Sequence, residues 1–184
     1  MSNGANVDRR ILKSQDAIKK AVIELMSEKR FNQITIQNIS DRANVSRRTI
    51  YLHYHDKYDL LDKLIEEHIN EMHAMCEWAC EMDWRGATIA FFEYFERNYL
   101  FFSTMLASKG AHSFRSRFLE FLMVEFKDEV DLTKEKNGGL DQDVILRFMG
   151  TAYVRLVEWW ITNEMPYSPR DMAHQVGVLL ERVV

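Results

Sequence analysis

Apolar side chains recur at three- and four-residue steps along most of the chain, and no segment keeps the two-residue period of a strand for long. In the first segment this spacing joins Ile11, Ile18, Ala21, Val22 and Leu25. Glycine is scarce and the first proline is Pro166, so little interrupts helix formation before that point. The pattern therefore predicts an all-α fold.

Polar residues at the edges of the apolar runs predict where these helices begin. Expected helices cover about 9–29, 36–43, 47–53, 57–80, 84–99, 100–108, 112–130, 141–163 and 169–182. The side chains placed to cap a helix start are Thr35, Ser46, Asp56, Asp83, Ser113 and Ser168, the last followed by Pro169. Asn44 suits a left-handed turn, and the polar stretch 134–139 is expected to be a mobile loop.

Bulk properties place the chain among globular proteins. It has 184 residues, of which 47% are hydrophobic and 28% charged. No apolar run approaches the roughly 20 residues of a membrane span, and no secretory signal is visible at the start. Cys76 and Cys80 are the only cysteines, and their spacing within one expected helix disfavours a disulfide. We therefore expect a cytoplasmic protein without membrane contact.

The charge is distributed unevenly. The net charge is −4, but residues 1–57 hold 11 Lys and Arg against 6 Asp and Glu. Residues 58–184 hold 13 and 22. A basic segment joined to an acidic body fits a polyanion-binding module attached to a regulatory one, although chance clustering on solvated faces gives the same imbalance.

Within the basic segment, two short expected helices are joined by a tight turn. Their apolar residues are spaced to form a small shared core: Ile36, Ile39, Ala43, Val45 and Ile50. This is the pattern of a helix-turn-helix, whose second helix enters the major groove of DNA. Arg47, Arg48 and Thr49 start that helix, where arginine can read guanine and a threonine methyl can contact thymine. Lys57 is placed to meet backbone phosphate instead.

The same stretch, TIQNISDRANVSRRTIYLHYHDKYDLL, resembles the DNA-binding domain of the TetR family of transcription regulators. The matching positions are Thr35, Ile39, Ala43, Val45, Ser46, Thr49, Tyr51, His53, Lys57, Leu60 and Leu61. Three positions depart from the family pattern, with Ser40 for alanine, Asn44 for glycine and Tyr54 for phenylalanine. The resemblance covers about 9–65, and a weaker one covers 154–172.

This resemblance implies a DNA-binding domain over 1–56 and a C-terminal helical domain for effector binding and dimerisation over 57–184. The residues it implies at the DNA are Thr35, Ser46, Arg47, Arg48, Thr49, Tyr51, His53 and Lys57. Thr35 and Ser46 serve equally well as helix caps, and packing would also explain Tyr51. Arg9, Arg10 and Lys13 either reach phosphates beside the first helix or are simply solvated.

One short recognition helix makes few base contacts, so regulators with this motif usually bind as two-fold dimers. The resemblance implies an interface on the last two helices, for which we select Phe148, Ala152, Leu156, Trp160, Val176 and Leu180. It also implies a small-molecule pocket among the middle helices. Candidate walls for an apolar or aromatic effector are Phe91, Phe95, Tyr99, Phe118, Phe121 and Trp159. Burial within one protomer is the alternative for both sets.

Other chemistry is weakly represented. His73, Cys76 and Cys80 share one helical face, but a fourth metal ligand is not evident, and we expect neither metal nor cofactor. No catalytic motif stands out, so an enzyme is not expected. The favoured function is a ligand-responsive repressor that binds a palindromic double-stranded DNA operator as a homodimer. The alternative is a regulator controlled by a protein partner.

Overall fold

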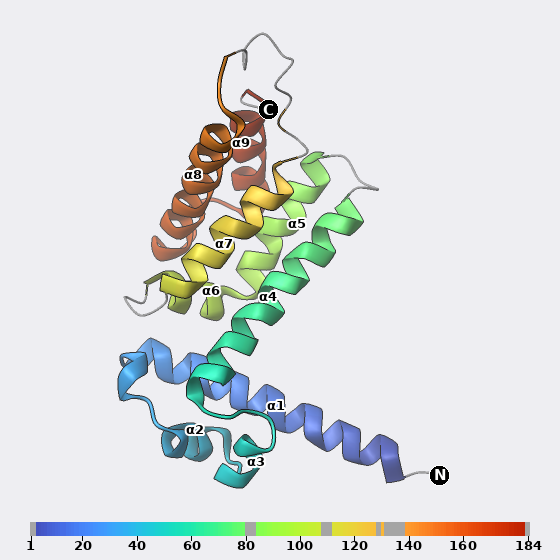
Figure 1. Cartoon of the computed structure of the whole chain (residues 1–184), viewed down its shortest axis with the longest axis vertical. Coiled ribbons are helices and arrows are strands. Elements are labelled where there is room, and N and C mark those ends of the chain that lie inside the picture. Colours follow the sequence, from blue (N-terminus) through green and yellow to red (C-terminus); the bar gives the residue numbers. More distant parts are fainter. Residues whose placement is uncertain (1–2, 80–83, 108–111, 128–129, 131–138, 183–184) are drawn as a thin grey trace. The chain divides into compact units, whose positions relative to one another are not determined.

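The computed structural model describes residues 3–79, 84–107, 112–127, 130 and 139–182, and these confirm the all-α fold (Figure 1). Its helices are α1 (Asn3–Glu28), α2 (Ile36–Ala43), α3 (Arg47–Tyr51), α4 (Lys57–Ala79), α5 (Trp84–Arg97), α6 (Tyr99–Ala107), α7 (His112–Glu125), α8 (Gln142–Thr162) and α9 (Pro169–Glu181). A short 3-10 helix, η1 (Phe31–Gln33), follows α1. None of the described helices is both long and apolar enough to cross a membrane.

Four predicted caps, Thr35, Ser46, Asp56 and Ser168, fix the starts of their helices, whereas the predicted cap Ser113 is wrong because α7 already begins at His112. The Oγ1 of Thr35 accepts from the backbone N–H of Asn38, and Asp56 accepts from the N–H groups of Tyr58 and Asp59. Ser168 caps α9, whose first residue is proline as expected. The expected start at Asp83 and the expected loop over 134–138 lie outside the described residues.

Helices α3, α5 and α7 end at least two residues earlier than their apolar pattern predicts, and the closing turns of α3 and α7 show why. Helix α3 stops at Tyr51 because the N–H of His53 bonds to the carbonyl of Ile50, which tightens the turn. Helix α7 stops at Glu125, where the N–H of Lys127 bonds to the carbonyl of Val124. At the ends of α3 and α7 a three-residue step thus replaces the four-residue step of an α-helix, a common way to close a helix end.

The chain divides into two compact units, Met1–Glu67 and His68–Val184, with the boundary inside α4. The expected division at residue 56 follows the end of the helix-turn-helix motif and stays a prediction about function. In the first unit α1 packs on α2, and α2 packs on α3. Lys19 of α1 also pairs with Glu67 of α4 at 2.7 Å, which places the first turns of α4 in this unit.

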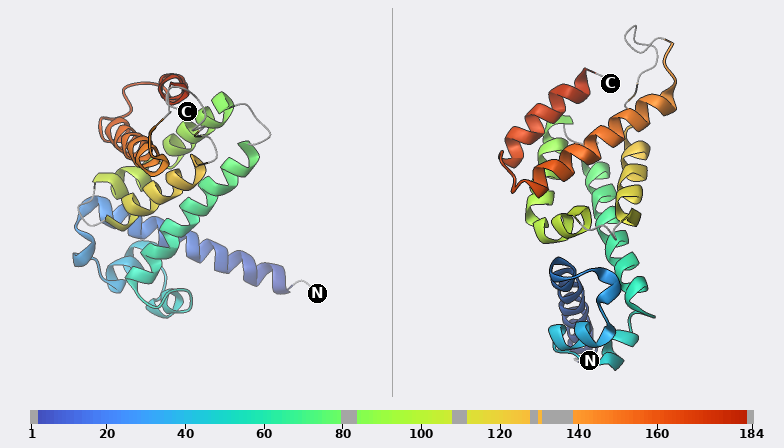
Figure 2. Two further views of the ribbon diagram at one scale, coloured as in Figure 1. Left: turned by 45° about the horizontal axis from the view of Figure 1, so that its top comes forward. Right: turned by 90° about the vertical axis from the view of Figure 1, so that its left-hand side faces the viewer.

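The second unit is built on the pairs α5–α9, α7–α8 and α6–α8. Its core is rich in aromatic rings, with Phe92, Phe95, Phe102, Phe114 and Phe118 fully buried. Gly150 of α8 allows the close approach of α7, since a Cβ there would meet Leu119 Cδ1 at 2.7 Å. The two views in Figure 2 show α5 beside α9.

Candidate nucleic-acid interface

The turn between α2 and α3 is closed by the chain's own polar groups. Asn44 takes the predicted left-handed conformation, with φ 52°. The Oγ of Ser40 donates to the carbonyl of Val45 at 2.6 Å, and the N–H of Val45 donates back to the carbonyl of Ser40. Ile39 and Ile50 are fully buried, which joins the two helices through a small apolar core. This is the arrangement that the sequence predicts for a helix-turn-helix.

Helix α3 presents its two arginines to solvent. Ser46 caps the helix by accepting from the N–H of Thr49 at 3.1 Å, and the two hydroxyl oxygens lie 2.9 Å apart. Arg47 and Arg48 are exposed, and neither forms an ion pair in the part of the chain that the structure describes. Tyr51, at the end of the helix, is 57% exposed and does not fill the core. The helix therefore offers two cations, a capped N-terminus and an aromatic ring to a ligand.

The segment after α3 attaches it to α1 and α4. Gln15 Nε2 lies 3.5 Å from His53 Nδ1, so the turn that follows α3 contacts α1. Tyr54 is buried, and this burial, together with the charge of Glu67, raises the pKa of its hydroxyl to about 12. The ammonium of Lys63 donates to the carbonyl of His53 at 3.1 Å and lies over the ring of Tyr54. These contacts fix the position of α3 in its unit.

Lys57 has a role that the sequence does not reveal. Its ammonium donates to three backbone carbonyls, those of Phe31 at 3.0 Å, Asn32 at 3.0 Å and Ile34 at 2.7 Å. The rings of Phe31 and Tyr58 lie 5.1 and 5.3 Å from the same nitrogen. All three ammonium protons are thus used inside the unit, in contrast to the exposed arginines of α3. The expected phosphate contact of Lys57 stays a prediction.

Asn38 holds the start of α2 in place, a structural role that the sequence pattern alone did not predict. Its side chain accepts from the N–H of Thr35 at 3.1 Å, which completes a capping box at the start of α2. It also accepts from the ammonium of Lys29 at 2.8 Å. The signal was its position three residues after Thr35, although the usual residue there is glutamate or glutamine. Thr35 is thereby held at the entrance of the motif.

Family comparisons agree with this geometry. Residues 18–64 match the model described as bacterial regulatory proteins, tetR family, and residues 82–182 match the model described as transcriptional regulator C-terminal region. The chain belongs to the TetR family. It is a transcription regulator with a helix-turn-helix DNA-binding domain.

Individual relatives resemble the chain to different extents. An uncharacterized HTH-type transcriptional regulator of Bacillus subtilis (strain 168), YxbF, is 34% identical over 67 residues, which are 36% of this chain and 18% of that protein. The crystal structure of a TetR transcriptional regulator from Streptococcus agalactiae 2603V is 25% identical, with a TM-score of 0.73 over 97% of this chain and 99% of its own. The regulator FadR of Bacillus subtilis, solved with stearoyl-CoA, is 20% identical, with a TM-score of 0.67 over 91% and 98%.

The residues expected to line an effector pocket are only partly together. Rings of Phe91, Phe95, Phe118 and Phe121 form one cluster, with centroid distances of 5.9–6.3 Å between neighbours. Trp159 is 43% exposed, and its ring lies near that of Tyr167. Its assignment as a pocket wall is therefore corrected, because α8 turns this side chain out of the core. Tyr99 is half-buried at the start of α6.

The expected dimer-interface residues divide in the same way. Phe148 is 67% exposed and Ala152 is also exposed. Trp160 is fully buried, with its Nε1 donating to the carbonyl of Tyr167 at 2.9 Å and its ring against Phe92. The structure thus corrects Trp160 from an interface residue to a core residue. Two further selected residues, Val176 and Leu180, are 2% and 7% exposed and are corrected for the same reason.

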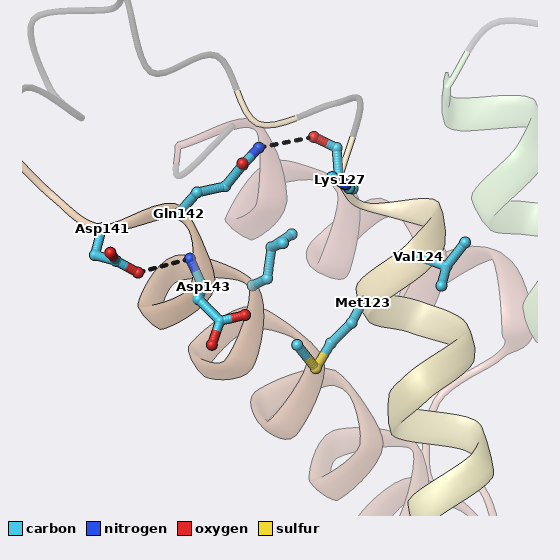
Figure 3. A pocket seen from close by; sticks show the side chains of 7 residues that line it. Met123, Val124, Lys127, Asp141, Gln142 and Asp143 are labelled. Atoms are coloured by element: carbon cyan, nitrogen blue, oxygen red, sulfur yellow. Dashed lines mark hydrogen bonds between the residues drawn. The ribbon is translucent and has the colours of Figure 1, made fainter.

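Two pockets lined by described residues lie away from the predicted aromatic walls. A groove of about 520 Å³ lies between the end of α7 and the start of α8, lined by Met123, Val124, Lys127, Asp141, Gln142, Asp143 and Leu146 (Figure 3). A smaller one of about 80 Å³ lies between α5 and α9, lined by Ile89, Ala173, His174, Gly177 and Val178. The location of an effector stays a prediction.

The weak metal candidate is not assembled by the described residues. His73 Nδ1 lies 2.7 Å from Glu125 Oε1 and its ring meets Phe121. Cys76 is half-buried, and Cys80 lies outside the described residues. No group of three metal-ligating side chains occurs in the described part of the chain.

Proposed function

We propose that the chain is a dimeric, ligand-responsive repressor that reads a palindromic operator with α3. The observation that carries this proposal is the pair of exposed arginines on a capped helix, whereas Arg42 and Lys57 of the same unit are held by internal partners. An arginine without an internal partner is available for guanine or phosphate. In this proposal Arg47 and Arg48 contact the major groove, and Tyr51 lies against the DNA backbone.

The remaining DNA contacts in this proposal are supporting ones. Thr35 uses an oxygen lone pair for capping, which leaves its hydroxyl proton free to point at a phosphate, whereas the hydroxyl groups of Ser46 and Thr49 share a hydrogen bond and one of their protons remains for a phosphate. The helix N-termini that Thr35 and Ser46 cap also favour an anion. Thr49 lies in the first turn of α3, which Ser46 caps, and offers its methyl group to thymine. His53, held beside Gln15, would contact a phosphate outside the base-reading surface.

A dimer brings two reading helices to one operator. On α8 the exposed residues Val144, Phe148, Ala152 and Trp159 are spaced at helical intervals and share one face. Leu156 borders this face and is half-buried, and Leu179 of α9 is 54% exposed. An exposed apolar face of this kind on a globular unit marks an interaction site. A two-fold contact would bury the same face of both copies.

The dimer has a direct test. Phe148→Asp places a charge in the proposed contact, and we expect sedimentation to show monomers at concentrations where the parent is dimeric. Val124→Asp on α7 is a matched control, since Val124 is 63% exposed and lies off this face. Equal sedimentation of both variants as dimers would remove α8 from the interface.

The operator has its own test. DNA duplexes of random sequence are selected with the full chain, and we expect a palindrome with half-sites about 34–36 Å apart. Arg47→Ala or Arg48→Ala should then weaken binding by about 1–3 kcal/mol and relax one position of each half-site. Selection of no sequence at all by the parent would overturn the proposal.

Regulation by a small molecule has an alternative, which one observation favours. The fold accommodates an acyl-CoA in FadR of Bacillus subtilis, which is compatible with an apolar effector here. Against this, Phe95 and Phe118 are fully buried by neighbouring rings, and this packing favours a regulator controlled by a protein partner. Release of the DNA complex by the dialysable fraction of a cell extract would support the effector. Release by the retained fraction alone would support the partner.

A further inference from the structure

Helix α4 passes from the first unit to the second between Glu67 and His68, and each of these residues has a polar contact within its own unit. Glu67 pairs with Lys19 of α1 at 2.7 Å. His68 Nδ1 lies 2.6 Å from the hydroxyl oxygen of Tyr94 on α5. The same hydroxyl donates to Glu71 Oε2 at 2.9 Å, about one helical turn further along α4. A single tyrosine thus fastens the first turn of α4 in the second unit to α5.

The ring of His68 is also held by α6. It stacks on the ring of Phe101 with 3.7 Å between centroids, and Phe102 meets it edge-on at 5.7 Å. His68 is half-buried, and Tyr94 is only 2% exposed. A cation over an aromatic face is attracted by the ring, an attraction that a neutral imidazole lacks. The stacking therefore fixes the orientation of the imidazole and favours its charged form.

The hydroxyl of Tyr94 determines which nitrogen of His68 must carry a proton. Burial, together with the hydrogen bond and the charge of Glu71, raises the pKa of this hydroxyl, and Arg97 opposes the rise more weakly. Tyr94 therefore keeps its single proton at neutral pH and donates it to Glu71. Its oxygen can then only accept from His68, so Nδ1 must carry a proton. The imidazolium always meets this condition, whereas the neutral ring has one proton for two nitrogens.

The charges around this network favour the imidazolium on balance. Among the described residues, the titratable and charged side chains that face it are Glu71 of α4 and Tyr94 and Arg97 of α5, and α6 contributes two uncharged rings. Glu71 attracts the charge of His68 through the shared hydroxyl, whereas burial of His68 and the charge of Arg97 oppose it. This opposition is limited, because His68 is only half-buried and Arg97 is exposed to water.

We propose that His68, Tyr94 and Glu71 form a proton-dependent attachment of α4 to α5, which is tight when His68 is charged and weaker when His68 is neutral. Because the attached state favours the charged form, the attachment is complete at low pH. It weakens progressively as the pH rises through the range of about 5–8 in which histidine titrates. Helix α4 is continuous across the boundary between the units (Figure 1), so its loosening reaches the DNA-binding unit, and this consequence for DNA rests on the proposed function.

The first experiment is an NMR titration of the full chain, which contains six histidines. The ring signals of His68 are identified by their loss in His68→Gln. Their titration midpoint in the parent should lie at least half a unit above the ordinary histidine value of about 6.5. Glu71→Gln keeps an acceptor for Tyr94 but removes the charge, and it should lower the midpoint. Glu66→Gln is the matched control, since Glu66 is an exposed carboxylate of the same helix outside this network, and it should leave the midpoint unchanged.

Amide hydrogen exchange reports the attachment itself. In the parent, the protection of α4 amides over 68–72, corrected for the pH dependence of intrinsic exchange, should fall about threefold between pH values of about 5 and 8, since half a pKa unit is about threefold in an equilibrium. Tyr94→Phe keeps the ring but removes both hydrogen bonds, so it should lower the protection and abolish its pH dependence. Tyr153→Phe is the matched control, since Tyr153 is also buried but packs against Phe118 and Phe126. It should keep the pH dependence.

The attachment and its link to DNA fail in distinguishable ways. A midpoint of His68 at or below the ordinary value, or one that is equal in the parent and Glu71→Gln, overturns the attachment. For the link, the duplex that the parent selects from random sequence is titrated at both pH values, and the affinity of the parent should depend on pH more strongly than that of Tyr94→Phe. Equal dependence, with the His68 midpoint raised, removes only the link. Selection of no sequence removes the proposed function, whereas the NMR and exchange results still decide the attachment.

Discussion

Different kinds of contact stabilise the interior of each of the two units of this regulator. In the first unit, short polar bonds define each turn, such as Ser40 with Val45 and Lys57 with three carbonyls. In the second, aromatic rings at 4.9–6.4 Å fill the space between helices. Polar bonds fix direction as well as distance, whereas ring contacts tolerate several orientations. This difference fits the proposed roles of the two units, a rigid DNA-binding unit and a second unit that responds to a ligand.

The largest expected effect on stability comes from removing an aromatic ring from the second unit. Phe118 is fully buried among Phe95, Phe114, Phe121 and Tyr153. Phe118→Ala should lower the free energy of unfolding by about 3–5 kcal/mol, because it removes apolar contacts and leaves a cavity. Urea unfolding at fixed protomer concentration measures the change.

Its control is Val124→Ala on the same helix, where the side chain is 63% exposed. This variant should change stability by no more than about 0.5 kcal/mol. A loss below about 1 kcal/mol for Phe118→Ala would show that the ring cluster is loosely packed.

The sequence predicts the helices of both units. Which side of each helix is buried could be predicted only in the first unit. Caps work over three residues, as from Ser46 to Thr49, so they are visible in the sequence. Burial in the second unit depends on neighbours far along the chain, as when Phe92 of α5 meets Trp160 of α8. From the sequence, either Trp159 or Trp160 could be the buried member of the pair. The position of α5 decides that Trp160 is buried and Trp159 is exposed.

The next largest effect concerns the ammonium of Lys57. Lys57→Met keeps much of the side-chain length but leaves the carbonyls of Phe31, Asn32 and Ile34 without this donor. Hydrogen bonds to charged groups contribute about 1.5–3 kcal/mol, and water will replace part of them. We therefore expect a loss of about 2 kcal/mol, with faster amide hydrogen exchange in α2 and α3.

The matched control is Lys20→Met, which removes an exposed cation of the same unit and should be near neutral. If Lys57→Met were equally neutral and only weakened DNA binding at every sequence, Lys57 would be a phosphate contact alone. The sequence could not separate these roles, because the carbonyls that Lys57 reaches are more than twenty residues away. The arginines of α3 were predictable because their exposure follows from a local turn.

A smaller effect comes from the turn of the first unit. Asn44 has φ 52°, a conformation that asparagine tolerates better than alanine. Asn44→Ala should reduce stability by about 1 kcal/mol, whereas Asn44→Gly should change it by only a few tenths. Thermal unfolding of the two variants, side by side, gives the difference. Equal stability would show that the turn adjusts its backbone to the residue present.

The second unit has a comparable turn with a less suitable residue, and the expected sign reverses. Glu164 follows α8 with φ 60°, and its N–H bonds to the carbonyl of Ile161. Glutamate in this conformation is strained by roughly 1–2 kcal/mol, whereas glycine loses about 0.5–1 kcal/mol in chain entropy. Glu164→Gly should therefore stabilise the protein by about 0.5 kcal/mol, measured by urea unfolding. A loss of stability instead would mean that packing in the second unit requires this strained turn. Hydrogen bonds would then fix turns in the second unit as well as in the first.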